Sequence, residues 1–398
     1  MQAEMNLIDT ILDQTSEIET PRSYIRWATL AAISGIVGKK VWTEKYAYKV
    51  YPNIFVMLIG PPGITKSYAT DISKKLVRAT NHTRIISGMN SIEGIIETLG
   101  SAQIDEKGLP SKDGSAKAFI VASEFTNLLL DNPQAFSVLT DLYDACYGDE
   151  WIKTLKSGTV KLKSPYITMI TATNTAHFND KLRQVDIEGG FIGRTIVILE
   201  KNRHCINSLI RKPNKTFDLS ALMPELKRIS QIAGEFTWAN EQAMKYFEEW
   251  DYDFKTKTKT DTTGIYKRMN DTVIKVAMLM SIADGDELCF TKNLLEKAIH
   301  TCTDLVTNIK SVTAGSGEAA NSQAMMKFMR CLIDSDDNRM DHNEMLRRNY
   351  QHFDVYEMAK IVETLEEGKI IRVEKAGPKK YYVMTDKAVG EFLRNKES

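Results

Sequence analysis

The sequence has few cysteines, no excess of charge of either sign and no long apolar run. The five cysteines lie far apart and form no C-x-x-C pair and no Cys/His cluster with zinc-ligand spacing, which excludes a disulfide framework and favours a reducing compartment. Lys and Arg together number 52, as do Asp and Glu, so any nucleic-acid contact must come from local basic patches. No stretch reaches the roughly 18 apolar residues of a membrane span, and we expect no membrane partner.

The composition that remains is that of a folded globular protein. Of the 398 residues, 43% are hydrophobic and 26% are charged, and both are ordinary globular values. At about 100–200 residues per domain, this length predicts roughly two to four domains, each able to bury its own core.

Four short apolar runs predict a parallel β-sheet, because each has the length of a strand and the stretches between them are long enough for helices. The runs cover residues 54–59, 118–122, 166–171 and 195–199. Before them, a helix is expected from Pro21 to Gly38, followed by a half-exposed strand or hairpin over residues 41–50. The predicted fold class is α/β, with an N-terminal helical and strand element at residues 1–50 and a parallel-sheet core at residues 51–205.

The rest of the chain is predicted to be mainly helical. Helical patterns near residues 219–234, 240–255, 266–283 and 292–312 predict a helical lid over residues 206–313. Small residues at 314–318 are typical of a linker. Three further helices and two strands then predict a winged-helix domain at residues 322–398; they cover residues 323–333, 341–349, 355–367, 370–373 and 381–384.

A glycine-rich loop follows the first of the four runs and precedes a helical pattern that begins at Tyr68. The loop reads Gly60-Pro61-Pro62-Gly63-Ile64-Thr65-Lys66-Ser67. In this order of strand, loop and helix, backbone N–H groups cradle phosphates, Lys66 reaches the β and γ oxygens and the Ser67 hydroxyl binds Mg²⁺, so ATP and Mg²⁺ are the expected cofactors. Thr65 replaces the second glycine of the usual G-x-x-x-x-G-K-S, and a β-branched residue disfavours positive φ. The alternative is a Gly/Pro turn beside an ordinary lysine.

This departure resembles the minichromosome maintenance and MoxR-like branches of the AAA+ superfamily, which replace the same glycine, usually by alanine. The chain is most similar to helicase-like AAA+ ATPases of phages and mobile elements, in which residues 21–27, the phosphate loop and the later motifs recur together. The resemblance covers residues 20–310, with an extension through the winged helix. It implies an AAA+ P-loop sheet with a helical lid, assembled as a homo-oligomeric, hexameric ring in a bacterial host cytosol.

Within that resemblance, the later motifs receive roles in ATP hydrolysis. Glu124, after the run at 118–122, would polarise the attacking water, and Ser123 stands where the family has an aspartate, so Ser67 and Ser123 are the implied metal ligands. Asn174, after the run at 166–171, matches sensor 1, which holds the lytic water. Arg194 is in the position of an arginine finger, which acts on the nucleotide of a neighbouring subunit. A structural salt bridge is the alternative for Arg194, and Arg183 is the competing finger.

Sensor 2 has two candidates on the helical pattern at residues 266–283. Arg268 and Lys275 both lie on it, and either could reach a phosphate. The resemblance favours Arg268 as a nucleotide-binding residue. A solvated helix face is the alternative for both.

Residues 151–163 predict a hairpin joined at Ser157-Gly158, with four lysines on it (Lys153, Lys156, Lys161 and Lys163). In minichromosome maintenance rings, a hairpin at this point enters the pore, and lysines there would contact nucleic-acid phosphates without sequence preference. Lys156 lies nearest the tip. Alternatively, the lysines only prevent edge-to-edge pairing of the hairpin. The polar stretch at 101–117 resembles a second pore element, the helix-2 insert.

The winged helix gives no clear sign of sequence-specific DNA binding. Its recognition helix, at residues 355–367, carries four glutamates that repel a phosphate-lined groove: Glu357, Glu363, Glu366 and Glu367. Its wing is basic, with Arg372, Lys375, Lys379 and Lys380. Docking of replication proteins and a weak wing contact with DNA are both open.

Three functions are compatible with these motifs. The first is an ATP-driven ring motor that translocates on single-stranded or forked DNA, a replicative helicase of a phage or mobile element. The second is an AAA+ helicase loader or a protein-remodelling, MoxR-like ATPase. The third is an ATP-dependent DNA-binding replication scaffold, which Thr65 and Ser123 suggest because both weaken the hydrolytic motifs.

Overall fold

The computed structural model describes residues 6–46, 48–88, 91–101, 116–125, 134–175, 178, 190–207, 214–256, 264–285, 287–313, 322–351 and 353–394. The chain divides into two units, Met1–Ser316 and Gly317–Ser398. Each unit has an apolar core of its own.

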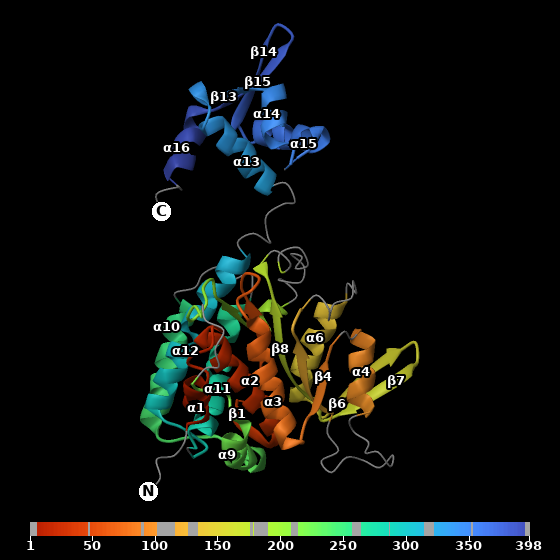
Figure 1. The fold of residues 1–398 in the computed structure, drawn as a ribbon, viewed down its shortest axis with the longest axis vertical. Helices are drawn as coiled ribbons and strands as arrows, with labels where there is room; N and C mark the ends of the chain where they lie inside the picture. The colour runs from red at the N-terminus through yellow and green to blue at the C-terminus, as the bar shows by residue number, and fades with distance from the viewer. Residues whose placement is uncertain are drawn as a thin grey trace. The chain divides into compact units, whose positions relative to one another are not determined.

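A five-stranded parallel sheet lies at the centre of the first unit (Figure 1). In spatial order its strands are β4 (Arg84–Ser87), β5 (Lys117–Ala122), β8 (Tyr166–Thr173), β3 (Phe55–Ile59) and β9 (Thr195–Leu199). The three middle strands are buried along their whole length, as expected for parallel strands covered on both faces. The four predicted strands and the α/β class are confirmed. The edge strand β4 was not predicted, because two apolar residues among polar ones give it little strand signal.

The helices of the first half are α1 (Leu7–Gln14), α2 (Arg22–Val37), α3 (Lys66–Thr80), α4 (Ile92–Ser101) and α6 (Ala135–Asp144), with 3₁₀ turns η1 (Gly38–Lys40), η2 (Ala145–Tyr147) and η3 (Ile192–Arg194). Of these helices, α2, α3 and α6 pack on the strands of this sheet, whereas α1 packs on α2. Helix α2 follows Pro21, as predicted, and packs along α3 (Figure 1). Most residues of α2 are buried, so it belongs to the core rather than to the surface. Helix α1 was not predicted.

The second half of the first unit is helical, as predicted. Its helices are α9 (Leu219–Gln231), α10 (Glu241–Thr256), α11 (Ile265–Asp284) and α12 (Lys292–Thr313). The expected hairpin at residues 41–50 consists of β1 (Val41–Lys45) and β2 (Tyr48–Val50), and β1 also pairs with β10 (Gly234–Glu235), while β11 (Thr237–Trp238) pairs with β12 (Cys289–Phe290). Among the described helices, none is long and apolar enough to cross a membrane.

Lys275, one of the two sensor 2 candidates, is a buried residue of α11 with 1% exposure. Its Nζ donates to Asn53 Oδ1 and to the Tyr143 hydroxyl, both at 2.8 Å, and lies 4.3 Å from the centre of the Tyr143 ring. Lys275 therefore ties α11 to α6 and to the segment before β3. Its ammonium is occupied by these two acceptors, although Lys275 also lines the cavity that Arg268 lines. That Lys275 reaches a phosphate stays a prediction.

The second unit contains the three predicted helices and the predicted hairpin. Its elements are α13 (Ser322–Ile333), η4 (Asp336–Asn338), β13 (Arg339–Asp341), α14 (His342–Asn349), α15 (Val355–Glu367), β14 (Ile371–Ala376), β15 (Lys379–Met384) and α16 (Asp386–Arg394). Strand β13 adds a third strand beside β15. Of the four glutamates in α15, Glu357 forms a capping box with Asp354 and so also stabilises the start of the helix.

We expect Lys275→Met to lower the free energy of unfolding of the first unit by about 1–3 kcal/mol, because the buried Asn53 carbonyl and Tyr143 hydroxyl lose their partner. All five tryptophans (Trp27, Trp42, Trp151, Trp238 and Trp250) lie in this unit, so tryptophan fluorescence during guanidinium denaturation reports on it alone. The control is Lys227→Met, on the exposed face of α9, with an expected change below about 0.5 kcal/mol. Equal stability of the two variants would contradict the structural role of Lys275.

Candidate nucleotide-binding site

The glycine-rich loop connects the carboxyl end of β3 to the start of α3, a helix of 15 residues. The first turn of a helix leaves backbone N–H groups unpaired, and here they begin at Lys66. A Cβ atom on Gly60 would lie 2.6 Å from both the Tyr24 hydroxyl and the Glu200 carbonyl, so only glycine fits. Gly63 has φ of 80°, and residues 61–63 are exposed. The loop is thus packed tightly on its inner side and open on its outer side, which suits an anion.

Thr65 adopts the left-handed conformation that a glycine would take, with φ 57° and ψ 35°. The expectation that a β-branched residue would avoid positive φ at this position is therefore wrong. The Thr65 hydroxyl donates to the Ile64 carbonyl at 2.8 Å and lies 2.8 Å from the hydroxyl of Thr20. Thr65 thus has a backbone conformation that glycine adopts freely.

Lys66 folds back over the loop. Its Nζ donates to the carbonyls of Gly60 at 2.7 Å and Pro61 at 3.0 Å. Burial lowers the pKa of Lys66, and the negative charge of Glu124 acts in the opposite direction. Ser67 is exposed beside it, and Tyr68 is half-buried. The ammonium of Lys66 is positioned to exchange loop carbonyls for the oxygens of an anion.

Three neighbouring strands end at the same edge of the sheet as this loop. Glu124 follows β5 and Asn174 follows β8, which lies between β5 and β3. Thr173, the last residue of β8, links Glu124 to the glycine-rich loop. Its hydroxyl donates to Glu124 Oε1 at 3.5 Å, and its carbonyl accepts from the Gly60 N–H at 3.4 Å. The parallel register therefore brings Lys66, Glu124 and Asn174 together, as the motif order predicted.

Ser67 and Ser123, the expected metal ligands, are both exposed at this edge. Hydroxyl oxygens are ligands that Mg²⁺ accepts together with water and phosphate oxygens. Among the residues that the structure describes, no group of three His, Cys, Asp or Glu side chains could hold a metal ion. The donor set at this edge suits a cation that enters with a phosphate ligand.

Arg194 lies at the other end of the strands, the amino edge of the sheet, in η3 just before β9 begins. Its Nε donates to both carboxylate oxygens of Asp144, at 2.9 and 3.1 Å, its Nη2 pairs with the same group, and its Nη1 donates to the Gly190 carbonyl at 2.9 Å. Burial lowers the pKa of Arg194, but the Asp144 pair outweighs it and the pKa is raised. The alternative of a structural salt bridge is thus realised in this conformation, and the side chain is 12% exposed.

Arg268 lies beside Arg194, since both guanidinium groups approach the Cβ position of Gly190. A cavity of about 490 Å³ adjoins them, and its lining includes Tyr48, Tyr147 and Thr272. Among the described residues, no group accepts a hydrogen bond from the Arg268 guanidinium. Thr195 is paired with Phe55 at the start of β3, whereas the loop begins after Ile59, so this cavity and the loop lie at opposite ends of the strands.

The predicted hairpin is present as β6 (Glu150–Leu155) and β7 (Gly158–Lys163). Its cross-strand pairs put Lys161 and Lys163 on one face and Lys153 on the other, with Lys156 exposed at the turn. The Lys153 face packs against α4, seen beside the hairpin in Figure 1. The turn is also fixed, because Ser157 Oγ donates to Glu97 Oε1 at 2.5 Å. The four lysines predicted to contact nucleic acid therefore lie on two faces of the hairpin. Lys156, Lys161 and Lys163 share the exposed side.

Residues that carry no motif also surround the loop. The Arg203 guanidinium lies 3.5 Å from the Cβ position of Gly63 and pairs with Glu19 at 2.7 Å. The hydroxyl of Tyr24 donates to the Ile59 carbonyl at 2.6 Å. The sequence signal for Tyr24 was its place in the segment at residues 21–27, and Arg203 stands just after the fourth predicted strand. Neither position indicates by itself that the chain returns to the loop.

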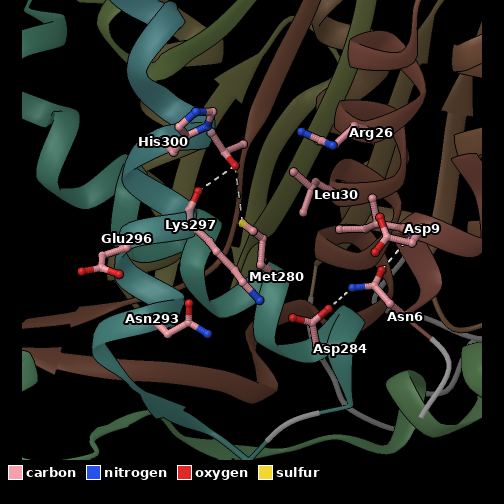
Figure 2. A pocket seen from close by; sticks show the side chains of 12 residues that line it. Asn6, Asp9, Arg26, Leu30, Met280, Asp284, Asn293, Glu296, Lys297 and His300 are labelled. Atoms are coloured by element: carbon pink, nitrogen blue, oxygen red, sulfur yellow. Dashed lines mark hydrogen bonds between the residues drawn. The ribbon is translucent and has the colours of Figure 1, made fainter. Parts of the chain in front are cut away.

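A second cavity of about 490 Å³ lies between α1, α2, α11 and α12, away from these residues (Figure 2). Its floor includes Leu30 and Met280, and Arg26, Lys297 and His300 surround it. Asn6 donates to Asp284 at its lower end and so connects the start of α1 to the end of α11. None of the predicted site residues lines this cavity.

Two predictions fall outside the described residues. Arg183, the competing arginine finger, is one of them. The other is the core of the polar insertion, residues 102–115, which resembles a second pore element.

We expect Gly60→Ala to lower the free energy of unfolding by about 1–3 kcal/mol and to impair phosphate binding, because its methyl group meets the Glu200 carbonyl and the Tyr24 hydroxyl. The matched control is Gly94→Ala in α4, where the added Cβ meets only Ser91 Oγ at 3.4 Å. There the free energy of unfolding should rise by about 0.5–1 kcal/mol. Guanidinium denaturation compares them, and a neutral Gly60→Ala would contradict the tight inner packing of the loop.

Comparisons with protein-family models and with curated proteins found no match to this chain. The residues at the two ends of the sheet strands are therefore the basis on which a function can be assigned.

Proposed function

We propose that the chain is an ATP-hydrolysing ring motor of the AAA+ type that translocates on nucleic acid, a DNA helicase of a phage or mobile element that works in the cytosol of a bacterial host. The observation that carries the proposal is the meeting of Lys66, Glu124 and Asn174 at the carboxyl edge of a parallel sheet, around a loop that begins a helix. A structural Gly/Pro turn would not require an ammonium and a carboxylate from a separate strand at the same place.

The residues at this edge fit ATP with Mg²⁺, because a loop closed on its inner side by Gly60 exposes the N–H groups of a helix start on its outer side. The N–H groups from Gly63 to Ser67 and the ammonium of Lys66 would hold the phosphates, while Ser67 and Ser123 would hold Mg²⁺. The Tyr68 N–H, which the resemblance also assigned to the nucleotide, donates to the Thr65 carbonyl at 3.1 Å. When bound, Mg²⁺ supplies positive charge to the phosphoryl group. Glu124 would accept a proton from the attacking water, and Asn174 would orient that water.

The separation of the two edges supports a ring. Arg194 and Arg268 lie at the amino ends of the strands, whereas the loop of their own chain lies at the carboxyl ends. They would instead act on the nucleotide of a neighbouring copy, in a head-to-tail arrangement that closes on itself. In this arrangement, Asp144 keeps the Arg194 guanidinium at a set place at the interface.

The exposed side of the β6–β7 hairpin is the proposed nucleic-acid contact. Lys156, Lys161 and Lys163 lie on this side, and lysines there give a sequence-independent attraction to phosphates. Lys161 also pairs with Glu150 at 2.7 Å, and Lys156 lies at the exposed turn of the hairpin. The second unit, proposed to be a winged helix, would dock replication proteins.

We expect single-stranded DNA to stimulate steady-state ATP hydrolysis and Lys66→Ala to reduce it by about 100-fold or more. Lys156→Ala should retain basal hydrolysis and lose most of the stimulation. The comparison variant is Lys153→Ala, on the opposite face of the same hairpin, which should retain the stimulation. An ATP hydrolysis rate that single-stranded DNA does not change would favour the loader or remodelling ATPase. Nucleotide binding without hydrolysis would favour the scaffold.

We expect Lys66→Ala and Arg268→Ala to be inactive separately and to recover activity when mixed. In an equimolar mixed ring, about a quarter of the sites combine an intact loop with an intact arginine from the next copy. Hydrolysis by the mixture, measured against each variant alone, checks this expectation. An inactive mixture, with assembly verified by sedimentation, would show that Arg268 serves its own chain.

A further inference from the structure

The segment before α2 contacts the phosphate loop at both of its ends. We call residues 19–24 the N-terminal strap. At the entry to the loop, the Tyr24 hydroxyl donates to the Ile59 carbonyl at 2.6 Å. At the exit, the Thr20 hydroxyl lies 2.8 Å from the Thr65 hydroxyl and 3.3 Å from the Thr65 carbonyl. The strap therefore spans the turn from β3 into α3.

The two threonine hydroxyls are hydrogen-bonded to each other at the exit, and either of them can be the donor. The Thr65 hydroxyl also lies 2.8 Å from the Ile64 carbonyl. Thr20 is 1% exposed, so water cannot replace its hydroxyl. The result is a short chain of hydrogen-bonding contacts that joins Thr20, Thr65 and Ile64.

This chain acts on a residue in an unfavourable conformation. Left-handed backbone is disfavoured for residues with a Cβ and most strongly for β-branched ones. Thr65 nevertheless has φ 57°, and the next residue is Lys66, the first of α3. Without the Thr20 hydroxyl, Thr65 would favour negative φ, which would turn the Lys66 N–H and the start of α3 away from the loop.

We infer that Thr20 is a positioning residue that holds Thr65 in the left-handed conformation, so that a threonine replaces the usual glycine without loss of phosphate binding. We call the hydrogen bond between the Thr20 and Thr65 hydroxyls the clasp. The consequence of the clasp for phosphate binding rests on the proposed function, whereas the clasp itself does not. A glycine at position 65 would need no clasp, because glycine adopts positive φ freely.

The strap itself is anchored from outside the loop. The Glu19 carbonyl accepts from the His204 N–H at 2.9 Å, and the Glu19 carboxylate accepts from the Asn207 N–H at 2.9 Å. Ser23 Oγ donates to Glu200 Oε1 at 2.6 Å. The segment that follows β9 thus fixes the strap, and the position of Thr20 does not depend on Thr65.

A double-mutant cycle on the full chain tests the inference, with wild type, Thr20→Val, Thr65→Gly and the double variant. Thr20→Val should weaken Mg·ADP binding, measured by calorimetry, by about tenfold, or about 1.4 kcal/mol. The same change in the Thr65→Gly background should alter the affinity by less than about twofold. Thr20→Ser, which keeps the hydroxyl, should bind like wild type.

The matched control is Thr29→Val in α2. Thr29 is fully buried like Thr20, but its hydroxyl donates only within its own helix, to the Ile25 carbonyl at 2.9 Å. Thr29→Val should leave the Mg·ADP affinity unchanged. Guanidinium denaturation of the four cycle proteins gives a second readout that needs no nucleotide. Thr20→Val should lower the free energy of unfolding more in the wild-type background than in the Thr65→Gly background.

The outcomes separate the clasp from the proposed function. Equal destabilisation by Thr20→Val in both backgrounds would overturn the clasp. Coupling in unfolding without coupling in Mg·ADP affinity would overturn its role in positioning the loop. Coupling in unfolding with no Mg·ADP binding by any of the four proteins would overturn the proposed function and leave the clasp intact.

Discussion

The turn from β3 into α3 is the constraint on which the site depends. The chain leaves a fully buried strand and begins a long helix within a few residues, between the Tyr24 hydroxyl and the Glu200 carbonyl. Gly60 is required where the space is smallest, and Thr65 is left-handed where the backbone reverses. On its outer side the loop is exposed at residues 61–63, and the Lys66 ammonium folds back onto the carbonyls of Gly60 and Pro61. An anion that binds there completes hydrogen bonds that the chain itself cannot provide.

The parallel sheet divides the chemistry of the protein between two edges. Loops that follow β5, β8 and β3 bring a carboxylate, an amide and an ammonium to the carboxyl edge. The amino edge carries Arg194 and Arg268, beside a cavity. Because parallel strands cannot bring their two ends together, a reaction that needs both sets of residues needs two copies of the chain. The proposed ring follows from this geometry rather than from any exposed apolar surface.

Side-chain alternation decides how the β6–β7 hairpin can be used. A cluster of lysines in the sequence becomes two groups, because successive residues of a strand point to opposite faces. One face packs on α4, and the Ser157–Glu97 hydrogen bond holds the turn to the same helix. In the proposed motor, α4 and the hairpin would therefore move together as one lever.

The sequence by itself determined most elements of this protein, though not α1, β4 or β13, because most depend on local patterns: apolar runs of strand length, helical periodicity and the glycines and prolines of the loop. It also determined that Lys66, Glu124 and Asn174 meet, since the ends of parallel strands share an edge. Only the tertiary structure decided the partners of individual side chains. Lys275 and Arg268 lie on one helix and line the same cavity, yet the Lys275 ammonium is held by Asn53 and Tyr143, whereas no described group accepts a hydrogen bond from the Arg268 guanidinium. From the sequence, Thr65 looked unfavourable for a left-handed backbone. The contact that stabilises this conformation comes from Thr20, 45 residues away in sequence, and no local pattern carries information about a contact at that distance.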